Sequence, residues 1–229
     1  MGRHTLEGNP PIDVILRRSA RAKRMSLRLS RLDGRVILTL PPHARDREGV
    51  AFLSEREAWL REHLADVAPV IPVGLGGDVM FEGRSHPIIA ATSGRARLEA
   101  GNFLVTDPAR AATQVKAILR IAARDRLAAA SDAYATQLGR QYARLSLRDT
   151  RSRWGSCSSA GVLMYSWRLI MAPPEILNYV AAHEVAHLVE MNHSDAFWAV
   201  VAGLDPDYQP KRRWLRENGD QLHRYQFDD

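Results

Sequence analysis

The sequence predicts an α+β fold in which a β-rich N-terminal unit precedes a mainly helical unit with a small sheet. Residues 12–105 contain short segments in which apolar and polar residues alternate, as they do in half-buried strands. Residues 109–138 lack glycine and proline and are rich in alanine, which favours one long helix. Residues 176–189 form a strongly apolar helical pattern. At 229 residues the chain can hold two small units, which we place at residues 1–107 and 108–229.

In the N-terminal unit, alternation predicts strands at residues 12–16, 25–30 and 35–40. The Asp33-Gly34 pair between the last two strands predicts a hairpin turn. Two prolines then end the strand, and we expect a helix over residues 47–68 with Trp59 on its apolar face. Residues 69–77 have the composition of a loop. Further strands are expected at residues 79–82, 86–90, 95–98 and 102–105.

In the second unit, a long amphipathic helix is expected from Pro108 to Gly139. Residues 143–148 and 162–167 then predict a second β-ribbon, with turns at Gly155 and Gly161. The apolar helix begins after residues 173–175. The tryptophans of this unit are expected to anchor its core, namely Trp154, Trp167, Trp198 and Trp214.

The apolar helix carries the motif His183-Glu184-Val185-Ala186-His187. Side chains at positions i and i+4 of a helix lie on one face, so both imidazoles can reach one metal ion, while Glu184 can contact a water molecule on that ion. Polar groups in so apolar a helix need a partner, because each unpaired buried group costs about 1–3 kcal/mol. A structural zinc site would use four protein ligands and usually cysteine, whereas this chain has only Cys157. The motif therefore predicts a catalytic zinc site with Glu184 as general base.

Two residues after the motif are candidates for the third ligand. Glu190 stays on the same face if the helix continues, but it then lies about 10 Å along the axis from His183. His193 can turn back towards the first two histidines if the helix ends near Met191-Asn192 and Ser194 caps the next helix. We favour His193 as the ligand. Glu190 is then either the acceptor of a hydrogen bond from a ligand imidazole or a solvated carboxylate at the helix end.

Residues 151–219 resemble the YgjP-like metallopeptidase family, which is related to the SprT-type and other zincin-like metallopeptidases. The resemblance rests on residues 152–157, 165–170, 172–173, 179–188, 192–194, 197–198 and 206–208. It continues more weakly upstream at Trp59, Gly83, Arg84, Leu138 and Gly139. It implies a zincin-like peptidase core that hydrolyses peptide bonds, with Zn²⁺ bound by His183, His187 and His193 and with Glu184 polarising the attacking water.

Composition and charge add expectations about partners and compartment. No apolar stretch approaches the roughly 20 residues that span a membrane, and the N-terminus lacks a signal-peptide core, so we expect a cytoplasmic protein with no membrane partner. Cys157 is expected to be a small packing residue. The net charge of +6 and the basic residues 17–24 hint at nucleic acid. That segment has no aromatic residue for base stacking, and we do not favour this partner.

We expect a peptide or protein substrate that adds as an extended strand to residues 162–167, treated as a sheet edge. Arg153, Arg168 and Tyr208 are candidates for stabilising the oxyanion, although each can equally be a structural hydrogen-bond donor. Two other functions stay open. One is a nucleic-acid-associated protein with the same fold that acts on DNA- or RNA-bound proteins, and the other is a zinc hydrolase that does not cleave peptides.

Overall fold

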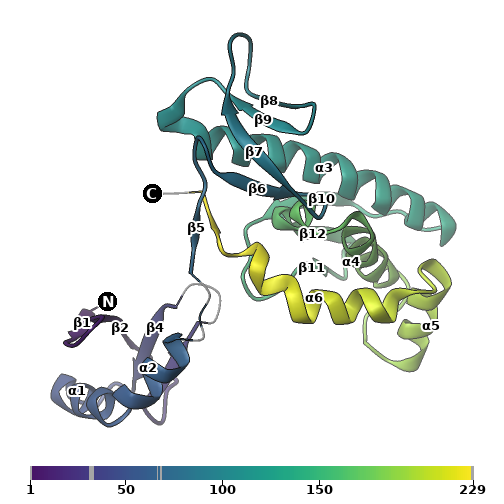
Figure 1. Ribbon diagram of the computed structural model, residues 1–229. Helices are drawn as coiled ribbons and strands as arrows, with labels where there is room; N and C mark the ends of the chain where they lie inside the picture. Colours follow the sequence, from purple (N-terminus) through teal and green to yellow (C-terminus); the bar gives the residue numbers. More distant parts are fainter. Residues whose placement is uncertain (1, 31–33, 66, 68, 228–229) are drawn as a thin grey trace. The chain divides into compact units, whose positions relative to one another are not determined.

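A computed structural model describes residues 2–30, 34–65, 67 and 69–227 as a mixture of helices and small sheets (Figure 1). Its contacts divide the chain into two compact units, Met1–Val70 and Ile71–Asp229. The boundary lies earlier than the expected position between residues 107 and 108. Within the described residues, no helix is long and apolar enough to cross a membrane.

The N-terminal unit is built on a four-stranded sheet. Its strands are β1 (Gly2–Leu6), β2 (Ile12–Arg18), β3 (Ser26–Leu29) and β4 (Val36–Leu40), in the order β1-β2-β4-β3. The neighbours β2 and β4 run parallel, whereas the other two pairs are antiparallel. The predicted hairpin is confirmed, because Leu29 on β3 lies opposite Val36 on β4. Asp33 of the predicted turn lies outside the described residues.

Helices α1 (Asp46–Glu55) and α2 (Glu57–Ala65) pack against this sheet. The expected single helix is interrupted at Arg56, whose N–H bonds to the carbonyl of Leu53. Leu53 and Leu60 are fully buried in an apolar core with residues of β1, β2 and β4. Trp59 is adjacent to Leu60 and therefore about 100° further round the helix, away from the buried face. It is 38 % exposed, so the expectation that it faces the core is wrong.

In the second unit, a four-stranded sheet precedes the long helix. Its strands are β6 (Asp78–Phe81), β7 (Arg84–Ala90), β8 (Arg97–Glu99) and β9 (Asn102–Val105), in the order β6-β7-β9-β8. Residues 69–77, expected to be a loop, include β5 (Ile71–Pro72), which pairs with β13 (Tyr225–Gln226) near the C-terminus. Val79, Ile88 and Phe103 are buried in the same core as the long helix. This shared core explains why the boundary falls at Val70.

The long helix α3 (Ala111–Gln137) follows a 3-10 turn, η1 (Pro108–Arg110), which the side chain of Asp107 caps. The prediction for residues 108–139 is confirmed except for this first turn. A row of small and aliphatic residues at steps of four forms the buried stripe of α3: Ala111, Val115, Leu119, Ala123, Leu127, Ser131 and Ala135.

The second small sheet contains β10 (Arg144–Arg148), β11 (Gly155–Cys157) and β12 (Val162–Ser166), in the order β10-β12-β11. Strand β12 is therefore the central strand, and the expectation that residues 162–167 form an open edge is wrong. A central strand has both sides hydrogen-bonded to neighbours, here parallel to β10 and antiparallel to β11. Both β10 and β11 are edge strands of this sheet. Gly155, which was expected in a turn, is the first residue of β11.

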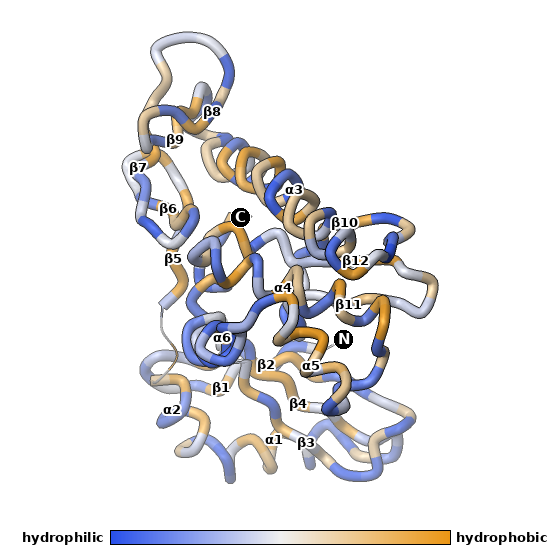
Figure 2. The backbone as a smooth tube through the Cα atoms, turned by 90° about the vertical axis from the view of Figure 1, so that its right-hand side faces the viewer, coloured by the Kyte–Doolittle hydropathy of each residue, from blue (hydrophilic) through white to orange (hydrophobic). Residues whose placement is uncertain are grey.

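The remaining elements are the 3-10 segment η2 (Trp167–Met171) and helices α4 (Pro174–Ala186), α5 (Asp195–Leu204) and α6 (Tyr208–Leu222). Figure 2 shows hydrophobic residues along α4 and α5 and a largely hydrophilic α6. Helix α4 contacts α3, α5, α6, η2 and β11, so it is enclosed on most sides. The four expected tryptophan anchors lie in this core or pack against it.

Candidate metal centre

Helix α4 begins at a proline pair and buries almost its whole length. Pro173 is the N-cap and Pro174 is the first helical residue, a position where proline lacks only an N–H that would be unpaired in any case. The helix ends at Ala186, and His187 is its C-cap. The motif therefore occupies the last turn of a buried helix, earlier than the expected end near Met191-Asn192.

The chain reverses direction directly after α4. The N–H of Glu190 bonds to the carbonyl of Ala186, and the carbonyl of Glu190 lies 2.9 Å from Nδ1 of His187. The hydroxyl of Ser194 then accepts a bond from the N–H of Phe197 and caps α5, as predicted. His193 therefore stands in the turn between the two helices.

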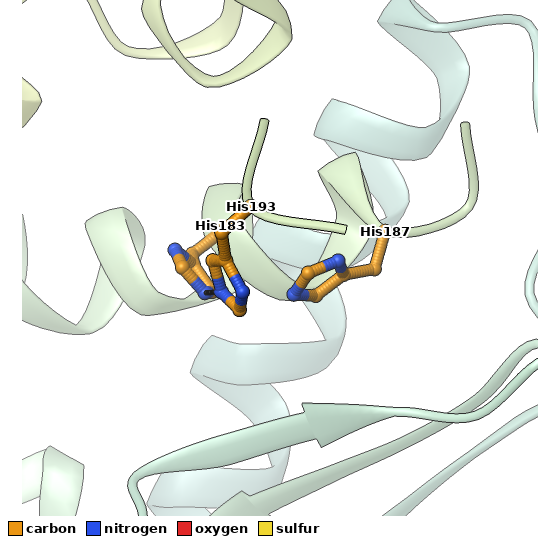
Figure 3. Close-up of side chains that lie close together, drawn as sticks. All are labelled: His183, His187 and His193. Carbon is orange, nitrogen blue, oxygen red and sulfur yellow. Dashed lines mark hydrogen bonds between the residues drawn. The ribbon is translucent and has the colours of Figure 1, made fainter. Parts of the chain in front are cut away.

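This turn brings the three histidines together (Figure 3). Nε2 of His183 and Nε2 of His193 are 3.1 Å apart, and one nitrogen of each of the three rings lies within 4.8 Å of the others. Ligand nitrogens that lie 2.0–2.1 Å from a tetrahedral zinc ion are about 3.4 Å apart. The cluster is thus close to the dimensions of a three-histidine metal site.

The surroundings of His183 and His187 favour the neutral imidazole that binds metals. Burial, together with repulsion from His187 and His193, lowers the pKa of His183 to about 3. Burial also lowers the pKa of His187, although the bond to the Glu190 carbonyl acts in the opposite direction. That bond identifies Nδ1 of His187 as the protonated nitrogen, which leaves Nε2 with a free lone pair.

Glu184 is 5 % exposed and makes no hydrogen bond or ion pair within the described part of the chain. Burial raises the pKa of its carboxyl group to about 8, while the charge of Arg153 opposes the shift. A Cβ atom added to Gly155 would lie 2.5 Å from Oε1 of Glu184. Strand β11 can therefore run directly past the carboxylate only because residue 155 is glycine.

The histidines and Glu184 open into a cavity of about 210 Å³. Its other lining residues are Gly155, Ser156 and Cys157 of β11 together with Met191. A second cavity of about 510 Å³, lined partly by residues 158–161, also includes His187 and Met191. Cys157 packs against the hydrophobic core, as expected, and also lines this cavity. Burial and the charge of Glu184 raise the pKa of its thiol to about 11.

The four additional site candidates, Arg153, Arg168, Glu190 and Tyr208, differ in how they are placed relative to the histidines. Arg153 is exposed, and its charge acts on Glu184. Glu190 contacts the site through its backbone carbonyl. Tyr208 stacks on Trp198 at 5.3 Å, and Trp198 in turn lies 5.7 Å from the ring of His183.

Arg168 is not brought to the histidines. Its guanidinium forms two bonds to Asp149 and donates to the carbonyls of Leu222 and Tyr225. It also lies over the rings of Trp167 and Phe227. None of these partners lines the cavity that contains the histidines.

Aromatic packing around the rings was missed in the sequence. Phe197 stacks on His187 at 4.4 Å, with 26° between the ring planes, and also contacts His183 and His193. The signal was available, because Phe197 follows His193 by four residues at the start of a capped helix. Gly155 carried no comparable signal, since glycine is common in turns.

Comparison with known proteins gives a family for this chain. The model of the YgjP-like metallopeptidase domain matches residues 23–218. A crystal structure of the metallopeptidase zymogen abylysin from Pyrococcus abyssi is similar over 41 % of this chain and 92 % of its own length, with 22 % identity and a TM-score of 0.36. A search of curated proteins finds no match. Because the family match covers most of the sequence, the chain belongs to the YgjP-like metallopeptidase family.

Proposed function

We propose that the chain is a zinc-dependent peptidase with a zincin-like core, in which His183, His187 and His193 bind the metal and Glu184 is the general base. The observation that carries the proposal is the Glu184 carboxylate, which is buried and unpaired beside three imidazoles. Burial makes this carboxyl group costly to ionise, and a metal ion bound by the imidazoles would supply the positive charge that favours its carboxylate form. The family supports a metal and peptide chemistry in general terms.

The donor set suits the proposed ion. His183, His187 and His193 would hold zinc through one ring nitrogen each, and three is the number of protein ligands that catalytic zinc sites use. Bound there, zinc supplies a Lewis acid that polarises a carbonyl and lowers the pKa of water to about 7. The carbonyl of Glu190 holds the ring of His187 in orientation, and Phe197 packs against all three rings.

Glu184 moves the proton in this proposal. Its carboxylate accepts a proton from the attacking water and delivers it to the amine that leaves. Gly155 leaves room for the carboxylate, because any side chain at residue 155 would occupy the same space. Arg153 and Tyr208 stay our candidates for stabilising the oxyanion, and Arg168 is left out because its donors already have partners.

We assign substrate docking to β11. An extended peptide can add to its free edge through main-chain hydrogen bonds, which places a peptide bond beside the cavity that β11 lines with the histidines and Glu184. This route demands little of the peptide sequence, because main-chain groups supply the contacts.

The test measures zinc content per chain and cleavage of unfolded casein in the same samples. The wild type is expected to bind one zinc ion and to lose activity on chelation. Glu184→Gln should keep the metal and lose about 10²–10⁴-fold in rate, the usual contribution of a general base. His193→Ala should lose the metal, whereas Glu190→Gln should keep it because only the Glu190 carbonyl touches the site.

Two results would contradict the proposal. One is wild-type protein that takes up no transition metal, and the other is a Glu184→Gln variant that is as active as the wild type. Metal-dependent hydrolysis of other substrates without peptide cleavage would retain the metal site and replace the peptidase assignment with another zinc hydrolase.

A further inference from the structure

One face of the N-terminal sheet carries arginines and has no helix on it within this unit. The core residues of the sheet, among them Val14, Val36 and Leu38, face α1 and α2. Strand residues alternate between faces, so the residues next to them point to the opposite side. The register places Arg3, Ile15, Ile37 and Arg28 in one row across all four strands.

The next row contains Arg17, Thr39 and Ser26. Arg3, Arg17 and Arg28 are exposed and have no ion-pair or hydrogen-bond partner within the described part of the chain. One carboxylate lies on this face in the described strands, Asp13, and it accepts a hydrogen bond from Thr5. The face is therefore strongly positive.

The basic segment noted in the sequence lies at one end of this sheet. Strands β2 and β4 end there and β3 begins there, because β2 and β4 are parallel and β3 is antiparallel to β4. Arg21, Lys23 and Arg24 in the connecting loop are exposed. Arg18 differs from them, because it pairs with Asp46 and donates to backbone carbonyls of the unit.

We propose that this basic face, made of Arg3, Arg17 and Arg28 with the loop residues Arg21, Lys23 and Arg24, binds the sugar-phosphate backbone of duplex nucleic acid. Guanidinium groups fit phosphate oxygens in pairs, and each contact releases counterions. The absence of aromatic residues argues against base stacking, but a phosphate contact needs none. The inference concerns the N-terminal unit and does not depend on the peptidase proposal.

The layout of the charges favours a duplex over a linear acidic peptide. Neighbouring strands lie about 4.8 Å apart, so the Cα atoms of Arg3 and Arg28 are about 14 Å apart across four strands. That separation is close to the roughly 12 Å width of a major groove, whose two edges carry phosphates. Arg17 lies two residues along the sheet from this row, so the charges cover an area rather than a line. A bilayer surface fits less well, because the apolar residues on this face, Ile15 and Ile37, are half-buried.

The test measures binding of a fluorescent mixed-sequence DNA duplex by anisotropy at several salt concentrations, with the full chain. The logarithm of the wild-type affinity should fall with the logarithm of salt concentration with a slope of about −3 if three phosphates are contacted. The variant Arg3→Gln/Arg17→Gln/Arg28→Gln should bind at least about tenfold more weakly at ~0.1 M salt and lose most of this slope.

The matched control is Arg95→Gln/Arg120→Gln/Arg124→Gln, which removes the same charge at exposed positions of the second unit. It should bind within about twofold of wild type, since these positions lie outside the basic face. If the sheet variant fails to fold, Arg21→Gln/Lys23→Gln/Arg24→Gln removes charge from the loop without touching a strand, and it should also weaken binding.

Several outcomes would overturn the inference. They are an absence of duplex binding, an equal loss in the control variant, and tighter binding of single-stranded DNA than of duplex. Competition by polyglutamate or by vesicles of anionic lipid that equals competition by duplex at the same charge concentration would also overturn it.

Discussion

The two units differ in whether polar side chains are buried in them. In Met1–Val70 the buried core consists of apolar residues, and the described arginines are exposed except for the half-buried Arg61. In Ile71–Asp229 polar and charged side chains are buried as well: Ser131, Ser166, Arg168, Glu184, His187 and Asp205. Burying such groups costs free energy unless partners compensate. The second unit therefore contains the positions at which each polar group must be explained individually.

Arg168 and Glu184 show the two possible explanations. Arg168 is 8 % exposed, and its donors are bound by Asp149 and by two backbone carbonyls, so its burial connects the end of α6 to the small sheet. Glu184 is 5 % exposed without any such partner. A buried ionisable group with partners maintains the fold, whereas one without partners beside a cavity is a candidate for a functional role.

Removing the guanidinium group of Arg168 should have the largest effect on stability. Arg168→Met leaves Asp149 and the carbonyls of Leu222 and Tyr225 without their donor, and we expect a loss of about 3–5 kcal/mol in the free energy of unfolding. Urea denaturation measures it. Arg120→Met, at an exposed position of α3, should change stability by less than about 0.5 kcal/mol. A loss below about 1 kcal/mol for Arg168→Met would show that the hydrogen bonds of Arg168 contribute little to the free energy of unfolding beyond the cost of burying its charge.

The separation of the units can be tested with one leucine from each core. Leu53→Ala removes a fully buried side chain of α1 and should destabilise the N-terminal unit by about 3 kcal/mol. Leu119→Ala is the matched change in α3. Amide hydrogen exchange should accelerate in β2 and β4 for the first variant and in α3 and α4 for the second. Faster exchange throughout both units in either variant would show that the chain unfolds as one cooperative body.

The close approach of β11 to Glu184 predicts a smaller effect that appears in activity. Gly155→Ala would place a methyl group 2.5 Å from Oε1 of Glu184, so the carboxylate must move. With Glu184 in its proposed role as general base, we expect a fall of about 10²-fold in kcat/KM for casein and an unchanged zinc content, because displacement of a catalytic group by about 1 Å has this order of effect.

Gly203→Ala is the control for this change, since a Cβ there meets nothing within 4 Å. It should leave activity unchanged and stabilise α5 by up to about 1 kcal/mol. Full activity in Gly155→Ala would mean that the carboxylate position is not critical for the reaction.

The sequence predicted local features better than distant ones. The hairpin of β3 and β4 and the long helix α3 follow from turn residues and periodicity, and the structure has both. The convergence of His193 with the motif histidines was also predicted, because Ser194 is a recognisable cap. These features depend on residues close together in the chain.

The strand order and the unit boundary depend on distant packing. Strand β11 spans three residues and begins with glycine, so alternation could not identify it, and β12 was taken for the edge. The strands β6 to β9 were grouped with the N-terminal unit because they follow it in sequence, although Val79, Ile88 and Phe103 pack in the core of α3. Helix α4 ends at Ala186, and Nδ1 of His187 then bonds to the carbonyl of Glu190, a contact that helical periodicity does not predict.

The smallest of the predicted effects is a loss of stability in acid, where protonation of Asp149 weakens its ion pair with Arg168. Burial alone would raise the pKa of Asp149, but hydrogen bonds and attraction from Arg168, with the charges of His223 and Lys116, lower it below its ordinary value of 3.8. A carboxylate with a lowered folded-state pKa contributes stability that is present above the unfolded-state pKa and is lost as pH falls through the folded-state pKa. The free energy of unfolding should therefore decline below about pH 4.

The Arg168→Met variant distinguishes this contribution from that of other carboxylates. Without the guanidinium, the main cause that lowers the pKa of Asp149 is gone, so this part of the acid dependence should disappear. Urea denaturation of both proteins between about pH 3 and pH 6 measures the difference between their slopes. Parallel curves for the two proteins would show that the interaction with Arg168 does not change the pKa of Asp149 between the folded and the unfolded state. The partners of Arg168 would then be placed by the surrounding apolar core rather than by charge.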